Sequence, residues 1–245
     1  MSVTSIIIYA VVFVIDIAVG IWYAKEGYPE TTMKAFWLKM LASGIFVATG
    51  VVFYLGSAKS KYDFLIIIAL VLGIIGDALL SFEPFIRQGE NRKRNILIVF
   101  FIGAGVFFGG HIVYIAAFVS EIKLLHAFDI KYFFIFWAAI IACTLVVKTA
   151  LRVKFGKFAV PISVYSLGLS AMGALSFTLA IFGFKGNIAE QLLLFIAPSL
   201  FIISDSSLGL KFTDKERFGS LNIRYVTLIT YYAAQMLFAL TIAAK

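Results

Sequence analysis

The sequence predicts an all-α polytopic membrane protein with eight transmembrane helices. Of the 245 residues, 62% are hydrophobic and 14% are charged, whereas soluble domains average about 45–50% apolar and about 25% charged residues. The apolar residues form eight continuous runs; helices of about 20 residues cross a hydrocarbon core of about 30 Å. Charged and turn-forming residues collect between the runs. This distribution excludes a soluble enzyme, a disordered chain and a disulfide-rich secreted module.

The eight expected helices form one integral membrane domain, residues 1–245, because no separator is long enough to hold a soluble domain. They lie near residues 3–23, 36–56, 64–82, 96–119, 132–151, 159–183, 189–210 and 223–243, with polar separators such as 25–29, 59–61, 88–94 and 214–217. The first run is expected to stay as a helix, because it has no basic leader, contains Asp16 and ends without a small-residue cleavage site. A β-barrel is excluded because the runs do not alternate in polarity.

The basic residues predict an orientation. Of the 21 Lys and Arg residues, 15 lie at the connections after the first, third, fifth and seventh runs, and six lie on the other side. The positive-inside tendency places the first group in the cytoplasm and both termini outside it. Cations scattered in this way face lipid headgroups, so the formal net charge of +8 predicts membrane lipids and no nucleic acid as partners. The single Cys143 cannot form an intrachain disulfide or a thiolate metal site.

Three acidic side chains, Asp16, Asp77 and Asp205, and one histidine, His111, fall inside the expected spans and away from their edges. Charge is costly in a bilayer, so such residues are functional candidates by default. The structural alternative is that each one caps a broken helix or bonds a neighbour. Asp16 has no polar company in its run and is assigned to packing or to the lining of a cavity.

The segments around Asp77 and Asp205 are alike. Both read Ile-Ile-small-Asp followed by small and leucine residues, and both aspartates lie about five residues before the expected end of their helix. The two helices are four apart in the chain and run in the same direction. A four-plus-four parallel repeat would bring the carboxylates face to face. The match is short, so chance similarity stands beside duplication as its explanation.

Other polar side chains share helix faces with these acids. Tyr231 and Gln235 lie four residues apart on the last helix, with Tyr232 adjacent. Lipid cannot satisfy such a face, so it should point at protein or at a wet cavity. Tyr165 joins this group more weakly, since interfacial tyrosines are common. The glycines before His111 indicate close helix packing and not a phosphate loop.

The ordered motifs are similar to those of a known family. They are Gly76-Asp77, residues 107–114 (FFGGHIVY), Val164-Tyr165 with Met172, residues 201–206 (FIISDS) and residues 231–237 (YYAAQML). This set resembles the YhhN-like lysoplasmalogenase family of eight-helix integral membrane hydrolases, over nearly the whole chain. The Ser-Asp-Ser and Tyr-Tyr-x-Ala-Gln segments are the most specific. The chain departs from the family at Lys39-Met40-Leu41, where lysine-proline-leucine is usual.

The resemblance implies hydrolysis of the vinyl ether bond of a lysoplasmalogen, an ether lysophospholipid. We expect no cofactor. The products would be a fatty aldehyde and glycerophosphoethanolamine or glycerophosphocholine. A vinyl ether is cleaved by acid: a proton must reach the alkene carbon distal to the oxygen, and water adds to the resulting cation. Glycosidases solve a related problem with two carboxylates. We therefore expect Asp77 and Asp205 to share the acid and base roles, in either order.

The remaining candidates would assist this pair. The residues expected to orient water or substrate are His111, Tyr165, Ser204, Tyr231, Tyr232 and Gln235. Lys39 and Arg224 are candidates for contact with the substrate phosphate, although basic residues at that level also meet ordinary lipid phosphates.

Two other functions fit parts of the same pattern. A divalent metal ion at Asp77, His111 and Asp205 is an alternative within the enzyme class, although catalytic zinc usually has more nitrogen or sulfur ligands. A proton-coupled transporter of a small or lipid-like substrate is the alternative from another class, because such proteins also carry repeated halves and intramembrane acids. A purely structural role would leave the matched polar faces unexplained.

Overall fold

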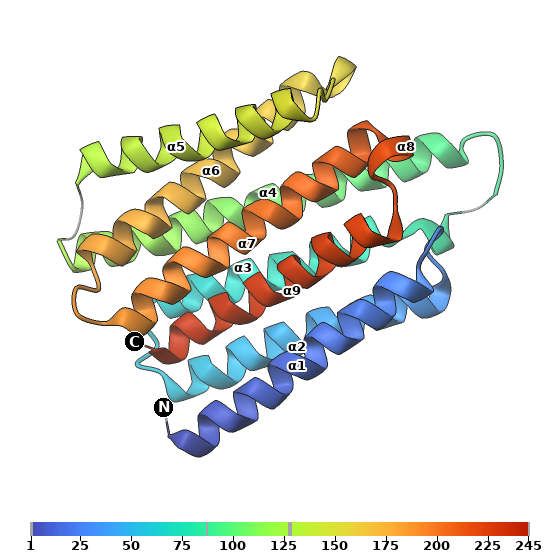
Figure 1. Ribbon diagram of the computed structural model, residues 1–245. Helices are drawn as coiled ribbons and strands as arrows, with labels where there is room; N and C mark the ends of the chain where they lie inside the picture. Colours follow the sequence, from blue (N-terminus) through green and yellow to red (C-terminus); the bar gives the residue numbers. More distant parts are fainter. Residues whose placement is uncertain (1, 87, 127–128, 245) are drawn as a thin grey trace.

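The computed structural model describes residues 2–86, 88–126 and 129–244 of the chain. Within these residues, eight helices are long and apolar enough to cross a membrane, which confirms the predicted all-α class (Figure 1). They are α1 (Val3–Glu26), α2 (Met33–Gly56), α3 (Lys61–Leu80), α4 (Arg92–Leu124), α5 (Ile130–Ala150), α6 (Ala159–Phe182), α7 (Ile188–Thr213) and α9 (Leu221–Ala244). Short turns of helix lie in the connections: η1 (Glu83–Phe85), η2 (Gly156–Phe158) and α8 (Lys215–Phe218).

The two ends of the bundle differ in charge. The connections α1–α2, α3–α4, α5–α6 and α7–α9 lie together at one end, at the right of Figure 1, and both termini lie at the other. The first of these is called the basic end from here on, because most of the Lys and Arg residues are at it. Two of the cations counted above, Arg87 and Lys245, lie outside the described residues. The side of the membrane that each end faces stays a prediction.

Polar side chains fix the starts of three helices that carry the site. Thr32 caps α2 by accepting a hydrogen bond from the Ala35 backbone N–H at 3.0 Å. Ser60 and Asp63 form a reciprocal capping box at α3, which satisfies two backbone donors that the first helical turn leaves unpaired. The Asn187 side chain accepts from the backbone N–H of Glu190 at the start of α7. These caps set where the helices begin and hence the height of the residues they carry.

Successive helices pack together within each half of the chain: α1–α2, α2–α3 and α3–α4 in the first, and α5–α6, α6–α7 and α7–α9 in the second. Between the halves, α2 packs against α9 and α6 packs against α4. When the first four long helices are compared in order with the last four, these contacts correspond pair by pair, although duplication itself stays a prediction. The first helix of each half departs from this correspondence. α1 packs against both α2 and α9, whereas α5 has its main contacts with α6, and no residue of α5, all of which are described, is buried.

The close approach of α1 to α9 depends on Gly20. A Cβ atom at this position would lie 2.5 Å from Cδ2 and 2.9 Å from Cε2 of the Tyr232 ring. We therefore expect Gly20→Ala to lower the free energy of unfolding by about 1–3 kcal/mol through overpacking, measured as thermal unfolding of the purified protein. Gly44→Ala is the matched control: a Cβ there meets no described atom within 4 Å, so helix propensity should leave stability unchanged or raised by up to about 1 kcal/mol. Equal effects of the two substitutions would contradict this account of the α1–α9 contact.

Candidate functional site

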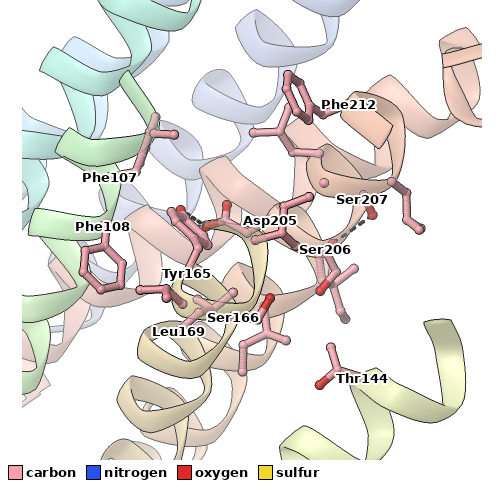
Figure 2. A pocket seen from close by; sticks show the side chains of 18 of the residues that line it. Phe107, Phe108, Thr144, Tyr165, Ser166, Leu169, Asp205, Ser206, Ser207 and Phe212 are labelled. Atoms are coloured by element: carbon pink, nitrogen blue, oxygen red, sulfur yellow. Dashed lines mark hydrogen bonds between the residues drawn. The ribbon is translucent and has the colours of Figure 1, made fainter. Parts of the chain in front are cut away.

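A large apolar cavity lies where α5 stands away from α4, between α4, α5, α6 and α7. Its volume is about 970 Å³, at the upper end of the range for small-molecule sites. Most of its lining is aliphatic or aromatic, and the polar side chains in it include Tyr165, Ser166, Ser206 and Asp205. Figure 2 shows these side chains on facing helices around the space. An intramembrane acid therefore borders an apolar chamber of ligand size.

Asp205 is held by two side chains from other helices. The Tyr165 hydroxyl, on α6, donates a hydrogen bond of 2.5 Å to Asp205 Oδ2 on α7 (Figure 2). His111 Nε2, on α4, lies 3.1 Å from the same oxygen and 3.0 Å from the Tyr165 hydroxyl. The His111 side chain is 1% exposed and that of Asp205 is 7% exposed. The three groups form a compact acid–phenol–imidazole cluster at the cavity wall.

The His111 ring is clamped by aromatic neighbours. It meets Phe201 and Tyr165 edge-on, with ring centroids 4.9 and 5.3 Å apart. Its Nδ1 is buried and has no hydrogen-bond partner among the described residues. The packing fixes the ring so that Nε2 is the nitrogen that faces Asp205.

Asp77 belongs to a second cluster built from α2, α3 and α9. Lys39 Nζ lies 3.0 Å from Asp77 Oδ1, and both side chains are almost completely buried. Ser43, four residues after Lys39 and therefore on the same face of α2, donates a hydrogen bond of 2.6 Å to Asp77 Oδ2. The Tyr231 hydroxyl donates another to the same oxygen at 2.8 Å. A buried ion pair needs additional hydrogen bonds of this kind to offset the loss of solvent.

A chain of hydrogen bonds leads away from Asp77 across the bundle. Gln235 Nε2 donates to the Tyr231 hydroxyl at 3.2 Å, and the Tyr114 hydroxyl donates to Gln235 Oε1 at 2.7 Å. The face of α9 that carries Tyr231 and Gln235 thus points into the protein and reaches α4. Tyr114 is three residues after His111, so α4 connects with both clusters.

The two aspartates have different hydrogen-bond partners, and aromatic rings lie between their clusters. Phe201 contacts both the Tyr231 ring, at 5.6 Å between centroids, and the His111 ring. The face-to-face carboxylates that a repeat would allow are therefore not what the structure forms. The two aspartates also lie at different distances from the ends of their helices. Asp77 is three residues before the end of α3, and Asp205 is eight residues before the end of α7, because α7 continues to Thr213.

The same separation weighs against the metal alternative. Within the described part of the chain, no group of three or more His, Cys, Asp or Glu side chains is arranged to hold a metal ion. Asp205 and His111 face each other, but Asp77 is bonded to Lys39 instead. The donor set at Asp77, His111 and Asp205 does not fit a shared ion.

Lys39 and Arg224 lie inside the bundle and not on its lipid-facing surface. The Arg224 guanidinium carbon is 4.8 Å from the centroid of the Tyr23 ring, and Lys39 Nζ is 5.5 Å from the same centroid. Arg224 is 8% exposed. The ammonium of Lys39 forms an ion pair with Asp77. Contact of Lys39 or Arg224 with a substrate phosphate stays a prediction.

The remaining predicted residues are buried nearby. Ser204 is buried on α7 beside Asp205. The Tyr232 ring packs against Phe46 and Tyr231. Asp16 is fully buried, and neither of its carboxylate oxygens has a hydrogen-bond partner among the described residues.

Three partners of the clusters were not singled out from the sequence: Tyr23, Ser43 and Phe201. For Ser43, its spacing of four from Lys39 was a usable signal. For Phe201 its place in the segment 201–206 was a signal, and for Tyr23 there was none, because aromatic residues are frequent throughout the spans.

Comparison with protein-family models matches the YhhN family over residues 34–242. The chain belongs to the YhhN family. The matched range contains every residue that bonds Asp77 or Asp205, and it leaves out the whole of α1, which carries Tyr23. No curated protein matches the chain, and no solved structure matches it. The YhhN family is associated with lysoplasmalogenase hydrolases.

Proposed function

We propose that the protein hydrolyses the vinyl ether bond of lysoplasmalogens, releasing a fatty aldehyde and glycerophosphoethanolamine or glycerophosphocholine. The observation that carries the proposal is the placement of Asp205 on the wall of an apolar cavity of about 970 Å³. A lysoplasmalogen has one apolar chain, with the reactive bond at the head of that chain. An apolar chamber with one acid in its wall supports chemistry at such a bond.

In this mechanism Asp205 is the proton donor. Its Oδ2 accepts from Tyr165, which leaves Oδ1 to carry a proton towards the cavity. That proton moves to the vinyl carbon distal to the oxygen, and the carbon bonded to the oxygen becomes an oxocarbenium ion. The carboxylate left behind stabilises this cation, as the carboxylates of glycosidases do.

The same carboxylate then acts as base. Water adds to the oxocarbenium carbon, and Asp205 takes one of the water protons, which restores the acid and leaves a hemiacetal. The bond between that carbon and the glycerol oxygen breaks, the hemiacetal hydroxyl proton passes to the glycerol oxygen, and the aldehyde is released. Tyr165 and His111, both within hydrogen-bond distance of Asp205, orient the carboxyl and the water.

Asp77 has a positioning role in this proposal, because it does not line the cavity. It accepts a hydrogen bond from Tyr231, whose ring contacts Phe107 at 5.8 Å between centroids. Phe107 is part of the cavity wall. Asp77 and Lys39 thus hold the Tyr231 ring, which packs behind Phe107 in the cavity wall.

The proposal is tested with purified protein in detergent, incubated with a lysoplasmalogen, an ester-linked lysophospholipid and a saturated 1-alkyl lysophospholipid. We expect aldehyde from the first lipid only, because only the vinyl ether forms an oxocarbenium ion on protonation. In D₂O the aldehyde should carry one deuterium on the carbon next to the carbonyl, and the reaction should be slower. Cleavage of the ester, or no aldehyde from any lipid, would rule the activity out.

This measurement also separates the hydrolase from a proton-coupled carrier. A carrier needs two compartments and converts nothing in detergent. Aldehyde release under these conditions is therefore an outcome that the transporter alternative cannot produce.

A further inference from the structure

The cavity is elongated along the helices. On α6 its lining runs from Pro161 to Phe177, a rise of about 24 Å at 1.5 Å per residue. On α7 it runs from Phe212 back to Ser199. Residues near the basic end and residues deep in the bundle therefore border one continuous space.

The two ends of the cavity have different chemistry. At the basic end it is lined by Lys148, whose Nζ lies 4.5 Å from the centroid of the Phe155 ring. Phe100 and Phe212, stacked at 4.4 Å, also line this end. Aromatic and basic side chains of this kind are typical of the headgroup level of a bilayer.

The deep end is apolar. Phe177 lines it, and its ring packs against Phe195 at 5.0 Å and Phe136 at 5.8 Å between centroids. Ser199 lies at the same end, and its hydroxyl bonds the Phe195 carbonyl of its own helix. A ligand in the deep end therefore meets hydrocarbon and aromatic surface.

The Asp205 cluster divides this length differently on the two helices. From Tyr165 to Phe177 the α6 lining rises about 18 Å, and from Tyr165 to Pro161 about 6 Å. From Asp205 to Ser199 the α7 lining rises about 9 Å, and from Asp205 to Phe212 about 10.5 Å. One lipid chain spans about half of a hydrocarbon core of about 30 Å, which is about 15 Å. The apolar segment on the deep side of the cluster, about 9–18 Å long, therefore suits one lipid chain, and the segment on the side of Lys148 suits the glycerol between the chain and the phosphate.

We propose that the cavity holds a single-chain phospholipid lengthwise and in one direction, with the phosphate at Lys148 and the chain end at Phe177, so that the deep end sets chain-length preference. This inference rests on the proposed function for the position of the reactive bond at Asp205. Lys148 supplies charge for the phosphate, and the wall at Phe177 limits the length of chain that fits.

The test measures binding of uncleavable 1-alkyl lysophospholipids with short, medium and long chains to the purified protein. Ser199→Phe should weaken binding of the long-chain lipid about tenfold, because overpacking of this size costs roughly a factor of ten, and should leave the short-chain lipid unchanged. Thr149→Phe is the matched control: Thr149 is exposed on α5 and bonds its own helix, as Ser199 does. Ser199→Leu makes a smaller intrusion and should give the same trend if the Phe variant does not fold.

The phosphate end is tested separately. Lys148→Gln should weaken binding of every phosphate-bearing lipid by about the same factor, leave the corresponding 1-alkyl glycerol unaffected, and keep the chain-length profile; Lys148→Arg should bind normally. The proposed direction would be overturned by a Ser199→Phe protein whose lipid affinity depends on chain length as in the unaltered protein, or falls equally for all chain lengths. It would also be overturned by a Lys148→Gln protein with unchanged phospholipid binding. Binding of uncleavable lipids does not require hydrolysis, so this result is independent of whether the proposed activity is found.

Discussion

Replacing Asp205 by asparagine is expected to lower the rate of aldehyde release by about 10²–10⁴-fold, the usual contribution of a general acid. Asparagine has nearly the shape of aspartic acid, and its amide oxygen still accepts the hydrogen bond that Tyr165 donates to Asp205 Oδ2. It has no proton to give to the vinyl carbon. The measurement is the turnover rate of purified protein on a lysoplasmalogen, with thermal unfolding as the check on folding.

Two comparisons show whether the loss is chemical. Binding of an uncleavable 1-alkyl lysophospholipid should be the same in Asp205→Asn and the unaltered protein, because the cavity walls do not change. Tyr165→Phe keeps the ring and removes the hydroxyl, so it should slow turnover less than Asp205→Asn does. An Asp205→Asn protein that retains near-normal turnover would show that the proton comes from another group.

The eight helices were predictable because a bilayer leaves few alternatives. An apolar run of about 20 residues must satisfy its backbone internally, and a helix does so. The acids were found for the same reason: charge is so costly in a span that Asp77 and Asp205 stood out among aliphatic neighbours. Composition and run length therefore carried both the fold class and the two cluster centres.

The pairing of the site residues was not predictable in the same way. Rotation of α3 and α7 about their axes decides whether Asp77 and Asp205 face each other, and nothing in their local sequences specifies it. In the structure Asp77 faces Lys39 and Tyr231, while Asp205 faces Tyr165 and His111. The segments around Asp77 and Asp205 are thus similar in sequence, but their carboxylates do not face each other.

The cavity also could not be predicted from the sequence. It exists because α5 packs mainly on α6 and stands away from α4, whereas α1 packs on both of its neighbours. Both helices are mostly apolar, and their few polar residues do not form a continuous face that would reveal their partners. Tertiary packing makes the difference, and with it the space beside Asp205.

Replacing Lys39 by methionine is expected to lower the free energy of unfolding by about 3–5 kcal/mol, because the loss of one partner leaves a buried charge uncompensated. The Lys39 and Asp77 side chains are 6% and 3% exposed, so water cannot take over the role of the missing ammonium. Asp77→Asn should be destabilising for the same reason. The double variant Lys39→Met with Asp77→Asn should recover much of the loss, since no unpaired charge remains.

A second ion pair in the same protein supplies the control. Lys34 lies 2.8 Å from Glu26, a shorter separation than that of the buried pair, but its side chain is 59% exposed. Exposed pairs contribute about 0–1 kcal/mol, so Lys34→Met should have little effect on unfolding in detergent. The coupling energy from the double-mutant cycle at Lys39 and Asp77 measures the pair directly. If the double variant is no more stable than the less stable single one, the destabilisation arises from lost packing of the lysine stem and not from an orphaned carboxylate.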